Sequence, residues 1–171
     1  MIEKVNLNFS AVISRKELPK GAVNLICKAT NDELEEITKQ LDVLKITYLQ
    51  ASITMEHDDD GAIFMKGDLK GNVTQACVIT LAPVNQELNV PLHIKLYPPK
   101  TPQTPLNDYL FLDFDEEYLE KDEIFIGDLL AQYAALALDP YPRHPEAEEG
   151  ELIEEGEESH KPLHALKKLL H

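Results

Sequence analysis

Residues 43–99 read VLKITYLQASITMEHDDDGAIFMKGDLKGNVTQACVITLAPVNQELNVPLHIKLYPP, and this stretch decides the fold. Apolar side chains recur at every second position in three runs, which is the period of a β-strand with one buried face. HDDDGA at 57–62 separates the first two runs and supplies Gly61 for a positive φ. The stretch therefore predicts three long antiparallel strands joined by short turns, in a meander.

The alternation within these runs predicts which side chains face the core. A one-residue slip in phase after Tyr48 indicates a β-bulge. Gly67 and Gly71 indicate a bend or bulge in the second run, and Pro91, which has no N–H, indicates a sheet edge or a bulge in the third. The expected core positions are Leu44, Ile46 and Tyr48, then Leu49, Ala51, Ile53 and Met55; Leu69, Gly71, Val73, Cys77, Ile79 and Leu81; and Leu88, Val90, Leu92, Ile94 and Leu96.

Two helices and shorter strands complete the expected domain. Strand-like runs precede residue 30, at 5–9 and 21–29, and a helix is predicted over 30–44, with Thr30 as its N-cap and Glu33 completing a capping box. Residues 124–139 predict a short strand and then a helix that stops at Asp139 because Pro140 follows. The apolar stripe expected on this second helix is Leu129, Leu130, Tyr133, Leu136 and Ala137.

The fold class expected from this pattern is α+β: long bent antiparallel β-strands, as a meander or a partly open barrel, packed by two main helices. We expect residues 1–145 to form a single domain. Residues 146–171 are expected to be an acidic, disordered and flexible tail that ends in a short amphipathic helix. In that helix Leu163, Leu166, Leu169 and Leu170 share one face, which needs a partner surface.

Charge is distributed unevenly along this chain, whose net charge is −15. Residues 1–97 carry a net charge of −3 and residues 98–171 a net charge of −12. The acidic half repels bare nucleic acid and anionic membranes, and it either attracts a basic protein or only keeps the chain soluble. The chain has neither a secretory signal pattern nor a membrane-spanning run, which together with its two distant cysteines favours a cytoplasmic location.

The sequence LALDPYPRHPEA at 136–147 places a rigid turn after the second helix. Its prolines either only end the helix or also hold Tyr141, Arg143 and His144 outward, where a rigid turn loses little entropy on binding. We take these three residues, with Lys161, Leu163 and Leu166 of the terminal segment, as candidate partner-binding residues. A weaker candidate for RNA binding is a basic patch of Lys66, Lys70 and Lys95, for which scattered solubilising lysines are the alternative.

Motifs for catalysis or cofactor binding are missing from the sequence. The six histidines and two cysteines show no metal-ligand spacing, and neither a phosphate-binding glycine loop nor a G-x-S-x-G motif occurs. Cys77 is expected on the core face of a strand, as a small buried side chain rather than a reactive thiol. We therefore expect no cofactor, no metal, no small-molecule substrate and no enzymatic activity; a thiol enzyme using Cys77 and a histidine is the rival reading.

Three stretches, at 71–99, 124–147 and 160–170, together resemble the YceD family, the large ribosomal RNA subunit accumulation proteins. The first is similar to the family's strand that ends at a cysteine and is followed by an alternating return strand. The second is similar to the family's Leu-rich helix, which ends in a proline-rich corner. HKPLHALKKLL is similar to the C-terminal NPF-x-x-L-x-x-LK element, and LDPYPRHPEA resembles the alphaproteobacterial members most. Many members have C-x-x-C and a later cysteine, whereas this chain has Thr80 after Cys77 and no cysteine after Pro140, so a thiol-pair or metal role does not carry over.

The resemblance implies a role in the accumulation of large-subunit ribosomal RNA. We therefore expect a non-catalytic ribosome-biogenesis factor whose partners are a basic large-subunit ribosomal protein, the ribosomal RNA precursor, or both. In this interpretation the acidic tail meets protein, and the sheet meets RNA or a second protein. The alternative is a small acidic chaperone for one basic client protein, without contact to RNA.

Overall fold

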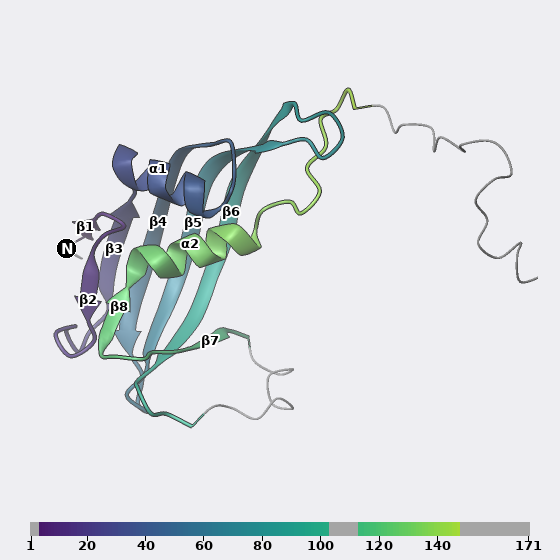
Figure 1. Cartoon of the computed structure of the whole chain (residues 1–171). Coiled ribbons are helices and arrows are strands. Elements are labelled where there is room, and N and C mark those ends of the chain that lie inside the picture. Colours follow the sequence, from purple (N-terminus) through teal and green to yellow (C-terminus); the bar gives the residue numbers. More distant parts are fainter. Residues whose placement is uncertain (1–3, 103–112, 148–171) are drawn as a thin grey trace, which may run out of the picture.

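The computed structural model describes residues 4–102 and 113–147, which form an open sheet with two helices on one of its faces (Figure 1). Six strands lie in the order β1-β3-β4-β5-β6-β7, and β2 pairs with β8 separately. The elements are β1 (Lys4–Leu7), β2 (Val12–Ser14), β3 (Val23–Lys28), α1 (Asn31–Gln40), β4 (Lys45–His57), β5 (Ile63–Ala76), β6 (Pro83–Tyr97), β7 (Asp115–Tyr118), β8 (Glu123–Phe125) and α2 (Ile126–Leu136). The α+β class is confirmed, and the large sheet is a meander with added strands, not a closed barrel.

The three long strands pair antiparallel as expected, and the bulge lies in β4. The register with β5 shifts between Ile46 and Tyr48, so the slip comes before Tyr48 and not after it. Consequently Tyr48 is exposed, and its prediction as a core residue was wrong. β7 pairs only with residues 94–97 of β6, so the part of β6 that contains Pro91 is an edge of the sheet. The missing N–H of Pro91 therefore costs no ladder hydrogen bond.

Two glycines permit close backbone approaches that no other residue allows. A Cβ on Gly67 in β5 would lie 2.0 Å from the carbonyl oxygen of Ser52 in β4. A Cβ on Gly127, in the first turn of α2, would lie 2.0 Å from the carbonyl oxygen of Phe9. Gly67 thus keeps β5 against β4, and Gly127 lets α2 sit directly on the segment that follows β1.

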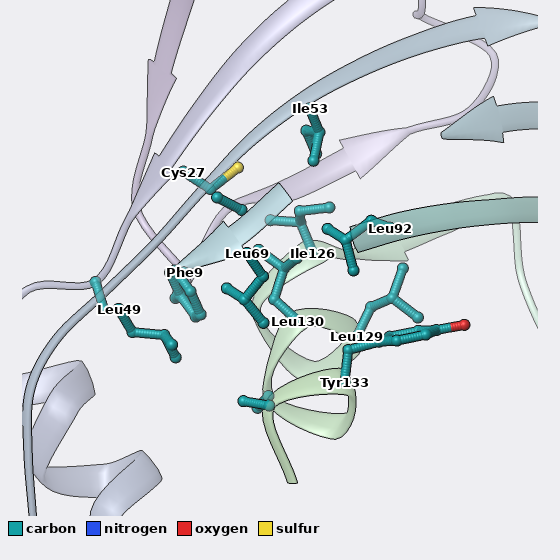
Figure 2. Close-up of a cluster of buried hydrophobic side chains, with 14 of the residues drawn as sticks. Phe9, Cys27, Leu49, Ile53, Leu69, Leu92, Ile126, Leu129, Leu130 and Tyr133 are labelled. Carbon is teal, nitrogen blue, oxygen red and sulfur yellow. The ribbon is translucent and has the colours of Figure 1, made fainter. Parts of the chain in front are cut away.

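The core lies between the sheet and the helices (Figure 2). Leu49, Leu69 and Leu92 come from neighbouring long strands and point toward Leu130 and Tyr133 of α2 in Figure 2. Phe9 enters the same cluster from the loop between β1 and β2. Burial of these side chains supplies the main stabilising free energy, at roughly 25 cal/mol per Å² of apolar surface.

Four further expected core positions lie at the surface instead. Leu44 precedes the first residue of β4 and is 54% exposed. β5 ends at Ala76, so Ile79 and Leu81 are on the following turn and are 45% and 76% exposed. α2 ends at Leu136, three residues before the expected stop, and the Leu136 side chain is 82% exposed. No helix among the described residues has the length and hydropathy needed to cross a membrane.

The N-terminus of α1 carries the predicted capping box and one further contact. Thr30 caps the helix, and a carboxylate oxygen of Glu33 accepts from the Thr30 N–H at 2.7 Å. The other oxygen accepts from the backbone N–H of Ser10 at 2.6 Å and from the Ser10 hydroxyl. Glu33 is only 8% exposed, and it therefore joins α1 to the loop that follows β1.

The pKa of Glu33 reflects these contacts. Burial alone would raise it, but the hydrogen bonds from Ser10 and Thr30 outweigh burial and lower the pKa from 4.5 to about 2. A carboxylate with a depressed pKa stabilises the folded state above its unfolded pKa, and this contribution is lost as the pH falls toward the folded value. The contribution of Glu33 is thus complete above about pH 4.5 and disappears near pH 2.

We expect Glu33→Gln to lower the free energy of unfolding at pH 7 by about 1–3 kcal/mol, since a buried charge-assisted network is lost. The difference from the wild type should narrow as the pH falls from 4.5 toward 2. Urea unfolding followed by circular dichroism across this pH range measures both effects. Glu36→Gln, on the exposed side of the same helix, is the control. A difference that stays constant with pH would contradict the assignment.

Candidate functional site: the open sheet face and the anchored corner

The face of the sheet that lies away from α1 and α2 carries a band of lysines. Cross-strand registers place Lys4, Asn24, Thr54 and Lys66 in one row, and Lys28, Gln50 and Lys70 in a parallel row four residues further along the strands. Asp68 of β5 lies between the two rows, and it is the acidic residue between Lys66 and Lys70. We call these four lysines, Lys4, Lys28, Lys66 and Lys70, the basic band; all four are exposed. The structure thus brings Lys66 and Lys70 together and adds two lysines that sequence reasoning missed.

Lys95 shares this face but not the basic band. Its ammonium group lies 2.6 Å from a carboxylate oxygen of Asp58 and 2.8 Å from one of Asp60, and its side chain is 12% exposed. Burial would lower the pKa of Lys95, but the two carboxylates outweigh burial and raise it. The charge of Lys95 is therefore balanced by the turn between β4 and β5, which separates Lys95 from the other two predicted RNA-binding lysines.

Aromatic side chains lie beside the basic band at one end of the open face. The ring of Phe64 makes edge contacts with His93 and Phe114, at centroid distances of 4.9 Å and 5.4 Å. The Lys66 ammonium lies 5.0 Å from the centroid of Phe64. Sequence reasoning missed this cluster, although Phe64 and His93 at polar-face positions of their strands were a usable signal.

The proline-rich corner after α2, at residues 139–147, is hydrogen-bonded to the hairpin of β5 and β6, and we call it the anchored corner. The Val78 N–H donates to the carbonyl of Pro142 at 2.9 Å, and the Gln75 side chain donates to the carbonyl of Asp139 at 3.0 Å. Gln86 of β6 donates to the carbonyl of Ala137 and accepts from the Asp139 N–H. The corner therefore does more than end the helix, because it docks the following chain onto the distant hairpin.

The three candidate residues of the corner differ in exposure. Tyr141 is 72% exposed, and Arg143 is exposed as well. His144 is half-buried, and its Nδ1 accepts from the Glu146 N–H at 3.2 Å. The other candidates, Lys161, Leu163 and Leu166, lie outside the described residues.

Cys77 is the centre of the anchored corner. Its Sγ accepts hydrogen bonds from the backbone N–H groups of His144 at 3.3 Å, Ile79 at 3.4 Å and Thr80 at 3.5 Å. Cys77 is buried as predicted, but it lies on the turn after β5 rather than on the face of a strand. The predicted burial is therefore confirmed and the predicted strand position is wrong, and the sulfur is surrounded by three backbone N–H donors.

The two cysteines have opposite pKa shifts. Hydrogen bonds, first from His144 and then from Thr80 and Ile79, lower the pKa of Cys77 from 9.0 to about 6 in spite of its enclosure. Burial raises the pKa of Cys27 from 9.0 to about 11. The sulfur of Cys77 thus links the corner to the turn through hydrogen bonds that favour its charged form, whereas burial favours the neutral form of Cys27.

The opposite side of the molecule has an acidic groove between β7, β8 and α2. Glu117, Glu120, Glu123 and Asp128 line a cavity of about 470 Å³ together with one base, Lys121, and with apolar residues that include Leu96 and Leu129. Burial, with the nearby charge of Asp115, raises the pKa of Glu117. Among the described residues, no cluster of His, Cys, Asp and Glu side chains has the arrangement of a metal site. The described surface is thus basic on the open sheet face and acidic along this groove.

We expect the Cys77 thiol to titrate near pH 6 and the Cys27 thiol near pH 11. Ultraviolet absorbance of the thiolate, followed against pH in Cys27→Ala and Cys77→Ala separately, measures each value. The folded pKa of Cys77 is depressed, so its stabilising contribution is complete above about pH 9 and is lost as the pH falls through about 6. The wild type should therefore gain stability over Cys77→Ala across this window, and a Cys77 midpoint near 9 would rule out the three backbone donors.

Comparison with known proteins now gives the family. The family model described as large ribosomal RNA subunit accumulation protein YceD matches residues 65–170, which is more than half of the chain. The match takes in most of β5, then β6, α2 and the anchored corner. No curated protein and no solved structure matches the chain significantly. The family match is sufficient to state that this chain belongs to the YceD family of large ribosomal RNA subunit accumulation proteins.

Proposed function

We propose that this protein is a non-catalytic factor that supports the accumulation of large-subunit ribosomal RNA by binding its precursor through the open sheet face. The family description gives the link to the large-subunit RNA. The single observation that carries the proposal is the basic band, which gathers Lys4, Lys28, Lys66 and Lys70 on the uncovered face of a chain with a net charge of −15.

The chemistry of this face suits a single-stranded or irregular RNA segment. Lysines neutralise backbone phosphates, and the amides of Asn24 and Gln50 between them offer hydrogen bonds to bases and sugars. The edge cluster of Phe64, His93 and Phe114 adjoins Lys66 and supplies ring surfaces on which bases stack. The acidic groove repels RNA, and the RNA is thereby confined to one face.

A basic ribosomal protein is the second partner that we propose, and it would bind along the acidic groove. Glu117, Glu120, Glu123 and Asp128 provide the charge, and the apolar lining residues provide burial. A small acidic chaperone that binds one basic client without RNA would use the same groove, and its basic band would bind no RNA. Binding of RNA by the purified protein distinguishes the two functions.

The surroundings of Cys77 favour a structural role over catalysis. Nucleophilic catalysis by cysteine needs a base at hydrogen-bond distance and room for a substrate. The donors to this sulfur are backbone N–H groups, and the imidazole Nδ1 of His144 accepts from Glu146. The side chain of Cys77 has no exposed surface. We therefore assign its sulfur to holding the corner.

We expect the double variant Lys66→Ala/Lys70→Ala to bind single-stranded large-subunit precursor RNA about tenfold more weakly at moderate salt. With four lysines on phosphates, log K should fall with log salt at a slope of about −3, and the double variant should flatten it to about −1.5. Fluorescence anisotropy with a labelled RNA measures both quantities. Lys39→Ala/Lys121→Ala removes the same charge away from the open face and is the control. RNA affinity equal in the two double variants would refute the basic band as the site.

The corner residues yield a separate test in cells. We expect Tyr141→Ala/Arg143→Ala to keep the melting temperature within about 2 °C, because exposed side chains contribute little to stability. The same variant should move from the fractions of large-subunit precursor particles to the top of a sucrose gradient, if the corner contacts a partner. Normal co-sedimentation would restrict the corner to its structural role, and a large drop in melting temperature would do the same.

A further inference from the structure

A groove lined by both apolar and polar residues lies at the end of the molecule where the described chain stops. The loop after α1, the turn after β5 and the anchored corner enclose a cavity of about 520 Å³. Its apolar lining consists of Leu41, Val43, Val78, Leu138, Pro140 and Pro142. We call this cavity the end groove.

Several large apolar side chains are exposed on the elements that form the end groove. Val78 is 50% exposed, and Ile79 and Leu81 on the same turn are 45% and 76% exposed. Leu136, on the last turn of α2, is 82% exposed. Clusters of exposed large apolar side chains mark sites that another surface covers, whereas scattered single ones need no explanation.

We propose that residues 161–170 of the same chain, which we call the terminal segment, cover the end groove. The segment reads KPLHALKKLL, and at helical spacing Leu163, Leu166 and Leu170 lie on one face. An amphipathic helix inserts such a face into an apolar groove through anchors three and four residues apart. The intramolecular surface supplies the partner that so short a helix requires.

The position of the chain exit favours this occupant. Pro142, which lines the groove, is held by Val78, and the described chain ends five residues later, at Ala147. Residues 148–160 then connect the corner to the terminal segment. Thirteen residues span at most about 45 Å, and a ten-residue helix is only about 15 Å long. A short tether of this kind gives an effective concentration in the millimolar range.

Charge also favours this occupant. Asp42 and Asp139 line the end groove and are exposed. The terminal segment carries Lys161, Lys167 and Lys168, and at helical spacing Lys167 lies beside its leucine face. The acidic connection at 148–160, by contrast, is repelled by the same aspartates. The basic apolar segment, and not the connection, is therefore the part of the tail that fits the groove. The match to the YceD family, over 65–170, takes in both the groove turn at 78–81 and the terminal segment.

The experiment is amide hydrogen exchange of the full chain, read by mass spectrometry of peptides. We expect amides at 163–170 to exchange at least about tenfold more slowly than in an unstructured peptide, at a rate that does not change with protein concentration. Val78→Asp should abolish this protection, and Val12→Asp should not. Val12 is 51% exposed on β2, at the other end of the molecule, and is thus matched to Val78 in exposure.

A reciprocal variant distinguishes loss of the docked segment from unfolding of the groove itself. Leu166→Asp changes no residue of the groove, yet it should speed exchange at 78–81, while His164→Asp, on the other face of the helix, should leave it unchanged. Protection of 163–170 that rises with concentration would assign the groove to a second copy and overturn the proposal. Absence of protection in the wild type, or protection that survives Val78→Asp, would overturn it as well. RNA binding through the basic band enters none of these measurements.

Discussion

The side chains of β4, β5 and β6 alternate between a face buried beneath α2 and its neighbours and a face that carries polar groups. A slip of one residue in any of these strands would expose its entire apolar set, so burial on one side fixes the register. The bulge between Ile46 and Tyr48 is compatible with this constraint because it keeps both Ile46 and Leu49 on the buried face. The same register places Lys66 beside Thr54 and Lys70 beside Gln50 on the open face, and the basic band is thus a consequence of core packing.

Local chemistry made much of this fold predictable from the sequence. The meander, the bulge, the turn at Gly61 and the capping box at Glu33 each depend on residues close together in the chain. The failures share a different cause. Leu136 fits the apolar stripe of α2 by periodicity, but the helix ends at that residue and its side chain is 82% exposed, and periodicity carries no information about where an element stops.

The site was predictable only in part, for the same reason. Lys66 and Lys70 are four residues apart on one strand, so alternation alone places them on the same face. Lys28 joins them only through the pairing of β3 with β4 and of β4 with β5. The loss of Lys95 from the patch depends on Asp58 and Asp60, and the altered thiol of Cys77 on an N–H of His144, 67 residues away. Charge and hydrogen-bond partners at such separations follow from the folded arrangement, which no single-sequence pattern contains.

The separation of charge between the two sides of the molecule bears on how two partners could bind. The basic band lies on the open face of the sheet, whereas the acidic groove lies where β7 and β8 meet α2. The Debye length at physiological ionic strength is about 8 Å. Screening over this length weakens the field of each surface with distance. The two surfaces share no residue, so an RNA on the open face and a basic protein along the groove would not compete for the same side chains. A chain with the same composition but mixed charges on both faces would bind neither partner selectively. The −15 net charge is compatible with an RNA-binding face because, among the described residues, Glu117, Glu120, Glu123 and Asp128 line the groove and not the open face of the sheet.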